Sequence, residues 1–177
     1  LIINGELSVL SDDADSIMVR TNPVDGVSLQ VIENGVQSTT LGNVAVADIT
    51  SINIRGGSGA NTIDLSGVVA ADFTGLTGVS VTGGDGDDII TGTAEFNDTI
   101  IAGDGNDTIT VGIGATSVDG GDGHDTITAA AGDDTIEGGD GHDLIMAGSG
   151  NDSVRAGDGH DTVSGEDGDD IIDAGDG

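Results

Sequence analysis

The chain contains three histidines, and each lies in the pentapeptide Gly-Asp-Gly-His-Asp, at residues 121–125, 139–143 and 157–161. A His-Asp pair can act as a general base, and a group of histidines can bind a transition metal or respond to pH. Catalysis also requires a pocket and a nucleophile, and the sequence contains neither an HExxH nor a GxSxG motif. We therefore predict no catalytic residue and no enzymatic activity, and we turn to the residues around each histidine.

Acidic residues dominate the charge of the chain. Its 177 residues include 33 Asp and Glu but 3 Lys and Arg, so the formal net charge is −30. Nucleic acid and anionic membranes would be repelled by this charge, whereas cations would be attracted. The sequence has no Cys and no run of about 18 apolar residues, so we expect neither thiolate metal sites nor membrane insertion.

Large side chains are scarce in this sequence. Glycine accounts for 33 residues, and the aromatic residues are Phe73 and Phe96. Such a chain cannot build an ordinary core, so it is either disordered or stabilised by something other than core volume. The regular spacing of its Ile and Val residues argues against disorder.

A nine-residue repeat begins at Gly83, as in the units GGDGDDIIT, AGDGNDTIT, GGDGHDTIT and AGDGHDTVS. The second unit, GTAEFNDTII, has ten residues, and the last is truncated to AGDG. Position six is Asp in every full unit except the one that contains Thr116. Position eight is always Ile or Val, at residues Ile90, Ile100, Ile109, Val118, Ile127, Ile136, Ile145, Val154, Val163 and Ile172.

This repeat predicts a solenoid of short strands. Glycines at positions one, two and four can adopt positive φ and turn tightly, and the β-branched residues at positions seven to nine favour a strand. The middle residue of a three-residue strand faces opposite to its neighbours, so position eight points inward. Two units then make one turn, and the strands of successive turns stack about 4.8 Å apart.

The turns must supply stabilisation that the narrow double column of Ile and Val cannot. The aspartates at position six stack above one another, and they repel each other unless a cation lies between them. Ca²⁺ takes oxygen ligands from carboxylates and backbone carbonyls, and a glycine-rich turn exposes its carbonyls. Calcium is therefore the expected cation.

The units resemble the GGxGxDxUx nonapeptide of the RTX, or haemolysin-type calcium-binding, family over residues 83–177. The resemblance implies an all-β fold: a right-handed parallel β-roll, or β-solenoid, with two nonapeptides per turn. It also implies that each Ca²⁺ lies between two turns on one edge. Oxygens from positions one, three and five of one loop would join those from positions two, four and six of the loop one turn on. We expect roughly six to eight Ca²⁺ ions and no other cofactor.

Alternate units share an edge of this solenoid. The first edge holds the units that begin at residues 83, 102, 120, 138, 156 and 174, and all of them carry Gly-Asp-Gly at positions two to four. The second edge holds the units that begin at residues 92, 111, 129, 147 and 165. It is degraded, because Thr116 replaces the Asp while Ala130 and Glu166 replace Gly. We expect four complete sites on the first edge and two on the second, completed by Asp152 and Asp170, with a weaker site at Asp134.

The resemblance implies a set of calcium ligands on each edge. On the first edge they are Gly83, Asp85, Asp87, Asp88, Ala102, Gly103, Asp104, Gly105, Asn106, Asp107, Gly120, Gly121, Asp122, Gly123, His124, Asp125, Gly138, Gly139, Asp140, Gly141, His142, Asp143, Gly157, Gly159 and Asp161. On the second edge they are Ala129, Ala131, Asp133, Asp134, Ala147, Gly148, Ser149, Gly150, Asn151, Asp152, Gly168 and Asp170.

Two further columns of side chains run along the first edge. The imidazole at position five is interpreted as a variable side chain that merely avoids adding another carboxylate. Its alternatives are adventitious binding of Zn²⁺ or Ni²⁺ and a pH sensor. The aspartates at position three could bind further cations, but a solvated acidic face is the favoured interpretation.

Residues 1–55 are predicted to form a β-rich N-terminal cap. Apolar and polar residues alternate in SIMVR, VSLQVIE and SINIR, which is typical of strands. Hairpin turns are expected at Asn4-Gly5, Asp25-Gly26 and Asn34-Gly35.

Residues 56–82 are predicted to form degenerate solenoid turns without metal, and residues 83–177 the calcium-binding roll. The unit GGSGANTID at residues 56–64 has Asn61 in the place of the Asp. Residues 65–82 lack nearly all of the features that bind calcium.

The expected function is that of an extracellular, cell-surface or secreted, calcium-binding structural module that folds when it binds Ca²⁺. The module could assemble head to tail into a filament, because residues 174–177 form half of a site. The alternative is the accessory roll of a larger secreted enzyme, such as a protease, lipase or epimerase, or of an adhesin. The expected partners are calcium ions, copies of the chain, or the rest of a longer chain, since the sequence starts at Leu1 and suggests a mature form or a fragment.

Overall fold

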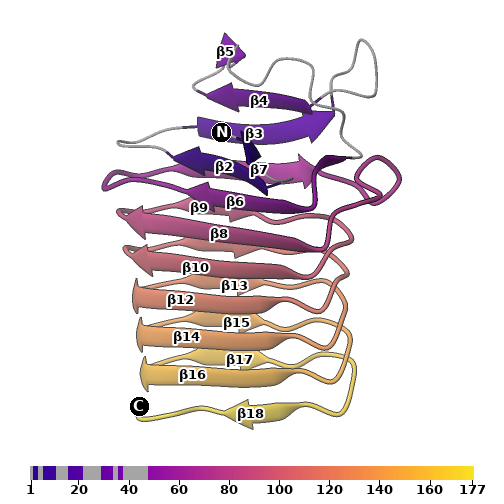
Figure 1. Ribbon diagram of the computed structural model, residues 1–177. Helices are drawn as coiled ribbons and strands as arrows, with labels where there is room; N and C mark the ends of the chain where they lie inside the picture. The colour runs from indigo at the N-terminus through magenta and orange to yellow at the C-terminus, as the bar shows by residue number, and fades with distance from the viewer. Residues whose placement is uncertain (1, 4–5, 11–15, 22–28, 34–35, 38–47) are drawn as a thin grey trace.

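The computed structural model is a solenoid made of two stacked β-sheets (Figure 1). It describes residues 2–3, 6–10, 16–21, 29–33, 36–37 and 48–177. In spatial order, sheet A consists of β1 (Ile2–Ile3), β2 (Glu6–Leu10), β6 (Ser51–Arg55), β8 (Gly78–Asp85), β10 (Asp98–Asp104), β12 (Ser117–Gly123), β14 (Thr135–Gly141), β16 (Ser153–Gly159) and β18 (Ile171–Asp173). Sheet B consists of β17 (Thr162–Ser164), β15 (Leu144–Met146), β13 (Thr126–Thr128), β11 (Thr108–Thr110), β9 (Ile89–Thr91), β7 (Thr62–Gly67), β3 (Ser16–Thr21), β4 (Leu29–Glu33) and β5 (Val36–Gln37). The part of the chain described here contains no helix that could cross a membrane.

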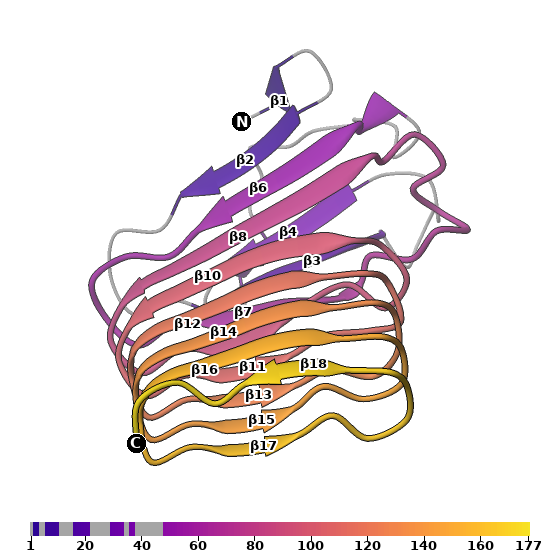
Figure 2. The ribbon, with the colours of Figure 1, turned by 90° about the horizontal axis from the view of Figure 1, so that it is seen from below.

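The nine-residue repeat produces parallel strands in strict register. In sheet A, Val118 pairs with Ile100 on one side and with Ile136 on the other, so each turn of the solenoid takes two units. In sheet B, Ile109 pairs with Ile127 and with Ile90. Seen from below, the chain alternates between the two sheets once per turn (Figure 2). The parallel solenoid with two nonapeptides per turn is therefore confirmed.

Position eight forms the core of the repeats, as predicted. Eight of its residues have at most 2% of their surface exposed: Ile90, Ile100, Ile109, Val118, Ile127, Ile136, Ile145 and Val154. Val163 is partly buried and Ile172 is 46% exposed, because both belong to the last turn. Small residues at position one, such as Ala102 and Ala156, complete the core.

The turn that precedes the regular repeats is longer than the turns that follow it. Ile63 pairs with Ile90, and Ile54 pairs with Val81, and both pairs are 27 residues apart in the sequence. The extra residues follow β7, and they bury large side chains against the core: Val68, Phe73 and Leu76. These rungs therefore have a larger apolar core than the later rungs.

The N-terminal strands add rungs to both sheets. β2 pairs in parallel with β6, and β3 pairs in parallel with β7, so these strands continue the solenoid. β4 and β5 extend sheet B in antiparallel fashion from β3. The segments SIMVR and SINIR form β3 and β6, and VSLQVIE contributes β4. The hairpin turns expected at Asn4-Gly5, Asp25-Gly26 and Asn34-Gly35 lie outside the described residues.

Candidate metal centres

The loops of the repeats stack directly on one another at both edges of the solenoid. Loops of the first edge run from the long strands of sheet A to the short strands of sheet B, as from β12 to β13. Gly121 and Asp122 pair with Gly139 and Asp140 of the next turn. On the second edge, Ala131 and Ser149 form a parallel bridge in the same way. Residues implied as ligands in units one turn apart are thus brought together in pairs of loops.

Glycine at positions two and four is required by this close stacking. Gly121 has a φ of 105° and Gly123 a φ of 144°, which are values that side chains with a Cβ rarely adopt. A Cβ on Gly121 would also collide with the carbonyl oxygen of Gly103, one turn back. Ala130 and Glu166 replace the position-two glycine on the second edge; Glu166 adopts a φ of 67°, whereas Ala130 does not adopt a positive φ.

The aspartates at position six form a hydrogen-bond ladder, here called the position-six ladder. The backbone N–H of Asp107 donates to Oδ1 of Asp125 over 2.8 Å, and the N–H of Asp125 donates to Oδ1 of Asp143 over 2.9 Å. On the second edge, the N–H of Asp134 donates to Oδ1 of Asp152 in the same way, over 2.8 Å. Each of these carboxylates therefore uses Oδ1 to accept a hydrogen bond from the loop one turn back.

The other carboxylate oxygen of these residues is buried without a hydrogen-bond partner. Within the described chain this holds for Oδ2 of Asp88, Asp107, Asp125, Asp134, Asp143, Asp152 and Asp161. A buried polar atom without a partner costs roughly 1–3 kcal/mol, and more when the group is charged. Such a column of orphaned oxygens is the arrangement that a divalent cation would stabilise.

Carbonyl oxygens lie beside the free carboxylate oxygens. A Cβ on Gly138 would lie 2.6 Å from Oδ2 of Asp143 and would also touch the carbonyl oxygen of Ala156, one turn on. A Cβ on Gly120 would likewise lie 2.5 Å from Oδ2 of Asp125 and would touch the carbonyl oxygen of Gly138. Carboxylate and carbonyl oxygens from two turns share one small space, and these are the ligands that Ca²⁺ prefers.

Burial raises the pKa of these carboxyl groups. For Asp107, Asp125 and Asp134, desolvation raises the pKa to about 6, and the N–H donated from the preceding turn opposes that rise. Repulsion from neighbouring carboxylates is a smaller cause that also raises the pKa, and it is included in the value of about 6. Asp88 and Asp143 shift in the same direction for the same main reason. A cation beside the column would favour the charged form and oppose these shifts.

Side chains alone do not make a metal centre here. Among the described residues, no group of three or more His, Asp or Glu side chains converges on one point. Each loop contributes a single position-six carboxylate, so backbone carbonyls must complete any coordination sphere. The carbonyl oxygen of Asp122 accepts a hydrogen bond from the N–H of Gly105 over 2.8 Å. At least one carbonyl oxygen among the implied calcium ligands is therefore already engaged in a hydrogen bond between turns.

Three places in the structure satisfy the position-six residue without a cation. Asp98 accepts the N–H of Thr93 on Oδ2 over 2.7 Å and its hydroxyl on Oδ1 over 2.9 Å. Thr116 donates its hydroxyl to the carbonyl of Gly114 over 3.1 Å. Asn61 donates its N–H and its Nδ2 to Oδ1 of Asp88 over 2.6 and 3.3 Å. The hydrogen bonds between Asp98 and Thr93 were not predicted, because nothing in the repeat identifies Thr93 as the partner of Asp98.

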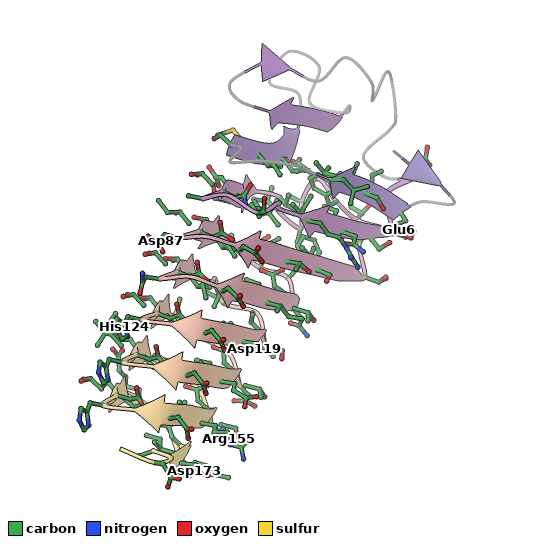
Figure 3. The ribbon with its side chains drawn as sticks, turned by 90° about the vertical axis from the view of Figure 1, so that its left-hand side faces the viewer. Glu6, Asp87, Asp119, His124, Arg155 and Asp173 are labelled. Atoms are coloured by element: carbon green, nitrogen blue, oxygen red, sulfur yellow. The ribbon has the colours of Figure 1, made fainter. Side chains whose placement is uncertain are left out.

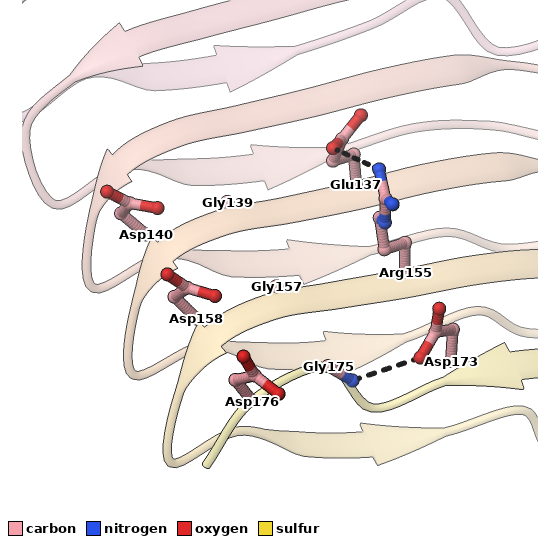
Figure 4. Close-up of a pocket in the computed structure, with 9 residues that line it drawn as sticks. All are labelled: Glu137, Gly139, Asp140, Arg155, Gly157, Asp158, Asp173, Gly175 and Asp176. Carbon is pink, nitrogen blue, oxygen red and sulfur yellow. Dashed lines mark hydrogen bonds and ion pairs between the residues drawn. The ribbon is translucent and has the colours of Figure 1, made fainter.

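The aspartates at position three lie on the outer surface of the first edge. Asp140, Asp158 and Asp176 line a shallow depression beside Arg155 (Figure 4). Arg155 forms an exposed ion pair with Glu137 over 3.4 Å, and such pairs contribute about 0–1 kcal/mol. The carboxylates of Asp140 and Asp158 are exposed, which agrees with a solvated acidic face.

The three histidines stack in a column along the first edge, at the side that Figure 3 shows with Asp87 and His124. The ring centroids of His124 and His142 are 4.9 Å apart, and those of His142 and His160 are 5.2 Å apart. The rings are nearly parallel, with interplanar angles of 10° and 5°, so they do not converge on a shared metal ion.

The comparison with family models identifies the repeats. A model described as "RTX calcium-binding nonapeptide repeat (4 copies)" matches residues 82–118, 119–154 and 146–177, which together make up more than half of the chain. The comparisons with curated proteins and with solved structures give no match.

Proposed function

Because the chain belongs to the RTX calcium-binding nonapeptide repeat family, we propose that residues 83–177 are held together by Ca²⁺ ions bound between stacked loops. RTX repeats imply calcium binding in a structural β-roll. The finer proposal is that the position-six aspartates supply the charged ligand and that backbone oxygens of the same and the neighbouring loop complete each site. Residues 56–82 would remain free of metal, and residues 1–55 would cap the roll.

The column of orphaned Oδ2 atoms is the observation that carries this proposal. Each of these oxygens belongs to an aspartate that is no more than 2% exposed or, for Asp161, partly buried. Without a cation, the folded state bears both the desolvation of each carboxylate and the repulsion between successive turns. With Ca²⁺ bound to the folded state alone, the fold gains stability by mass action at every site.

In the folded state, the chain's own residues give each site its shape. Glycines with positive φ bring successive loops into contact, and Oδ1 of each aspartate fixes the carboxylate to the loop one turn back. Calcium, when bound, supplies the positive charge that balances Oδ2. The roll would then be a scaffold that calcium switches from loose to rigid, with no catalytic part.

An extracellular location follows from the same physics. The chain carries a charge of −30, and its sites need enough free calcium to outweigh that repulsion, which is a condition met outside cells. Within this class, the roll would serve either as a structural module or as the accessory roll of a larger secreted enzyme or adhesin.

Head-to-tail assembly is favoured by one specific observation. In β18, the position-eight residue Ile172 is 46% exposed, and a further rung would cover it as the equivalent residues of earlier rungs are covered. A second copy, or more of the same chain, would supply that rung. Sedimentation velocity in calcium tests this point: concentration-dependent growth supports assembly of the chain, and a monomer at all concentrations contradicts it.

A calcium titration followed by circular dichroism tests the proposed function. We expect β signal to rise with Ca²⁺ in a chelator-treated protein, and Mg²⁺ at the same concentration to be much less effective because it demands a smaller octahedral site. A spectrum that is the same in chelator and in calcium would contradict the proposal.

A further inference from the structure

The side chains at position five form a second hydrogen-bond ladder, here called the position-five ladder. Oδ1 of Asn106 accepts the backbone N–H of His124 over 3.0 Å. Nδ1 of His124 accepts the N–H of His142, and Nδ1 of His142 accepts the N–H of His160, both over 2.8 Å. From the sequence, the imidazole was interpreted as a variable side chain without a role of its own. In the structure, Nδ1 of His124 and of His142 accepts a hydrogen bond from the next turn.

The same ladder recurs with other residue types and on the other edge. Oδ1 of Asp87 accepts the N–H of Asn106 over 2.8 Å. On the second edge, Oδ1 of Asp133 accepts the N–H of Asn151 over 2.8 Å, and Oδ1 of Asn151 accepts the N–H of Asp169 over 3.2 Å. Asp, Asn and His share one feature, which is an acceptor atom bonded directly to Cγ. Position five thus varies in residue type while its acceptor keeps the same distance from the backbone.

The two ladders run in opposite directions between the same loops. His142 donates its N–H back to the side chain of His124, while Asp125 donates its N–H forward to the side chain of Asp143. Adjacent residues of two loops are therefore joined by a reciprocal pair of hydrogen bonds. Such a pair fixes both the spacing and the register of the loops whose oxygens surround the free Oδ2.

The acceptor at position five accompanies the free carboxylate oxygen along the chain. The seven aspartates with an orphaned Oδ2 are preceded by Asp87, Asn106, His124, Asp133, His142, Asn151 and His160. Of the three position-six residues that are satisfied without a cation, Asn61 and Thr116 are preceded by Ala60 and Ala115, whereas Asp98 is preceded by Asn97. An alanine cannot accept a hydrogen bond, so no position-five bond joins these two loops to the next turn, although the N–H of Asn61 and of Thr116 still donates to Oδ1 of Asp88 and of Asp134.

We infer that the side chain at position five is a positioning residue for calcium: it holds two consecutive loops in register so that the position-six carboxylate can bind the ion. This inference rests on the proposed function. It concerns hydrogen-bond acceptance by a neutral imidazole. It assigns a role to the three histidines that requires neither catalysis nor a transition metal.

Substitutions of His142 separate hydrogen bonding from ring stacking. His142→Asn keeps an acceptor on Cγ and loses the stacked ring, whereas His142→Phe keeps a ring and loses the acceptor. His142→Gln places its acceptor one bond further from the backbone. The quantity compared is the calcium concentration at the midpoint of folding, here called the calcium midpoint. We expect the midpoint of His142→Asn to stay within about 2-fold of the wild-type value. Both other variants should raise the midpoint by about 3-fold to 10-fold, which corresponds to the loss of one net hydrogen bond. Asn151→Asp and Asn151→Leu form a matched pair on the second edge.

Two spectroscopic readouts distinguish positioning from general destabilisation. In calcium-loaded protein, the imidazole ¹⁵N shifts of His124 and His142 should show an unprotonated Nδ1. Amide exchange of His160 should be slow in wild type and His142→Asn and fast in His142→Phe. Equal calcium midpoints and equal His160 exchange for the Asn and Phe variants would overturn the inference. If the folding of the wild-type protein does not depend on calcium, the proposed function is overturned instead. The two failures are therefore distinguishable.

Discussion

The rungs before residue 82 and the rungs after it solve the same packing problem in different ways. The early rungs bury Ile52, Ile54, Leu65 and Phe73, so their core resembles that of an ordinary protein. The later rungs bury one Ile or Val per strand, beside small residues and buried aspartates. A solenoid can thus be stable through apolar volume at one end and, we propose, through bound cations at the other.

Position six shows the difference at a single place in the repeat. In the early rungs it is Asn61, whose side-chain Nδ2 donates to Oδ1 of Asp88 and to the carbonyl oxygen of Gly59. In seven of the later loops it is an aspartate whose Oδ2 has no hydrogen-bond partner, whereas Asp98 and Thr116 are satisfied by neighbouring groups. The amide of Asn61 donates to Oδ1 of Asp88 and leaves Oδ2 of that carboxylate without a hydrogen-bond partner.

The largest expected effect is on the apolar core of the early rungs. Ile54→Ala should lower the free energy of unfolding by about 2–5 kcal/mol, because a fully buried side chain leaves a cavity. Urea denaturation in calcium and in chelator measures it. The loss should be similar in both, with Ile54→Val costing only about 0.5–1.5 kcal/mol; a loss that disappears in calcium would show that these rungs also depend on the ion.

Asp143→Ala should affect the later rungs through calcium. The variant removes the free Oδ2 and leaves the N–H of Asp125 without its acceptor. We expect a loss of about 1.5–3 kcal/mol, which raises the calcium midpoint roughly tenfold to a hundredfold. Isothermal titration calorimetry should also detect less bound calcium. Asp143→Asn keeps an acceptor oxygen without the charge, so a calcium affinity equal to wild type in that control would contradict the assigned role.

Asn61→Asp should make an early rung behave like a later one. The change removes the amide donors to Asp88 and places a second carboxylate beside it. In chelator we expect a loss of about 1–2 kcal/mol, partly recovered in calcium. Asn61→Ser, which loses the amide without adding charge, is the control and should show no recovery.

The metal-free protein should become more stable as the pH falls. This change in the free energy of unfolding should be smaller than the changes expected for the substitutions above. The pKa values of Asp107, Asp125 and Asp134 are about 6 in the folded chain, above the ordinary 3.8, so the folded state binds more protons between these values. The free energy of unfolding therefore falls as the pH rises from about 4 to about 6 and stays low above. Urea midpoints in chelator at pH 5 and pH 7.5 measure this, and equal midpoints would contradict it. With calcium the trend should reverse, because protons compete with the ion.

Much of this architecture could be predicted from the spacing of residues. The alternation of glycine-rich and β-branched stretches determines the 18-residue turn, and the inward direction of Ile127 follows from strand geometry alone. The 27-residue turn could not be predicted, because Val68 and Phe73 have no counterpart in the repeat. The position-five ladder was also missed, because Asp, Asn and His look dissimilar until their acceptors are seen at the same distance from the backbone.

Hydrogen exchange measured by mass spectrometry, in calcium and in chelator, tests the division between the two regions most directly. We predict that peptides from residues 83–177 lose their protection when calcium is removed, while those containing Ile52, Ile63 and Val79 remain protected by their apolar core. Equal protection of both regions in chelator, or loss of protection throughout the chain, would contradict the account.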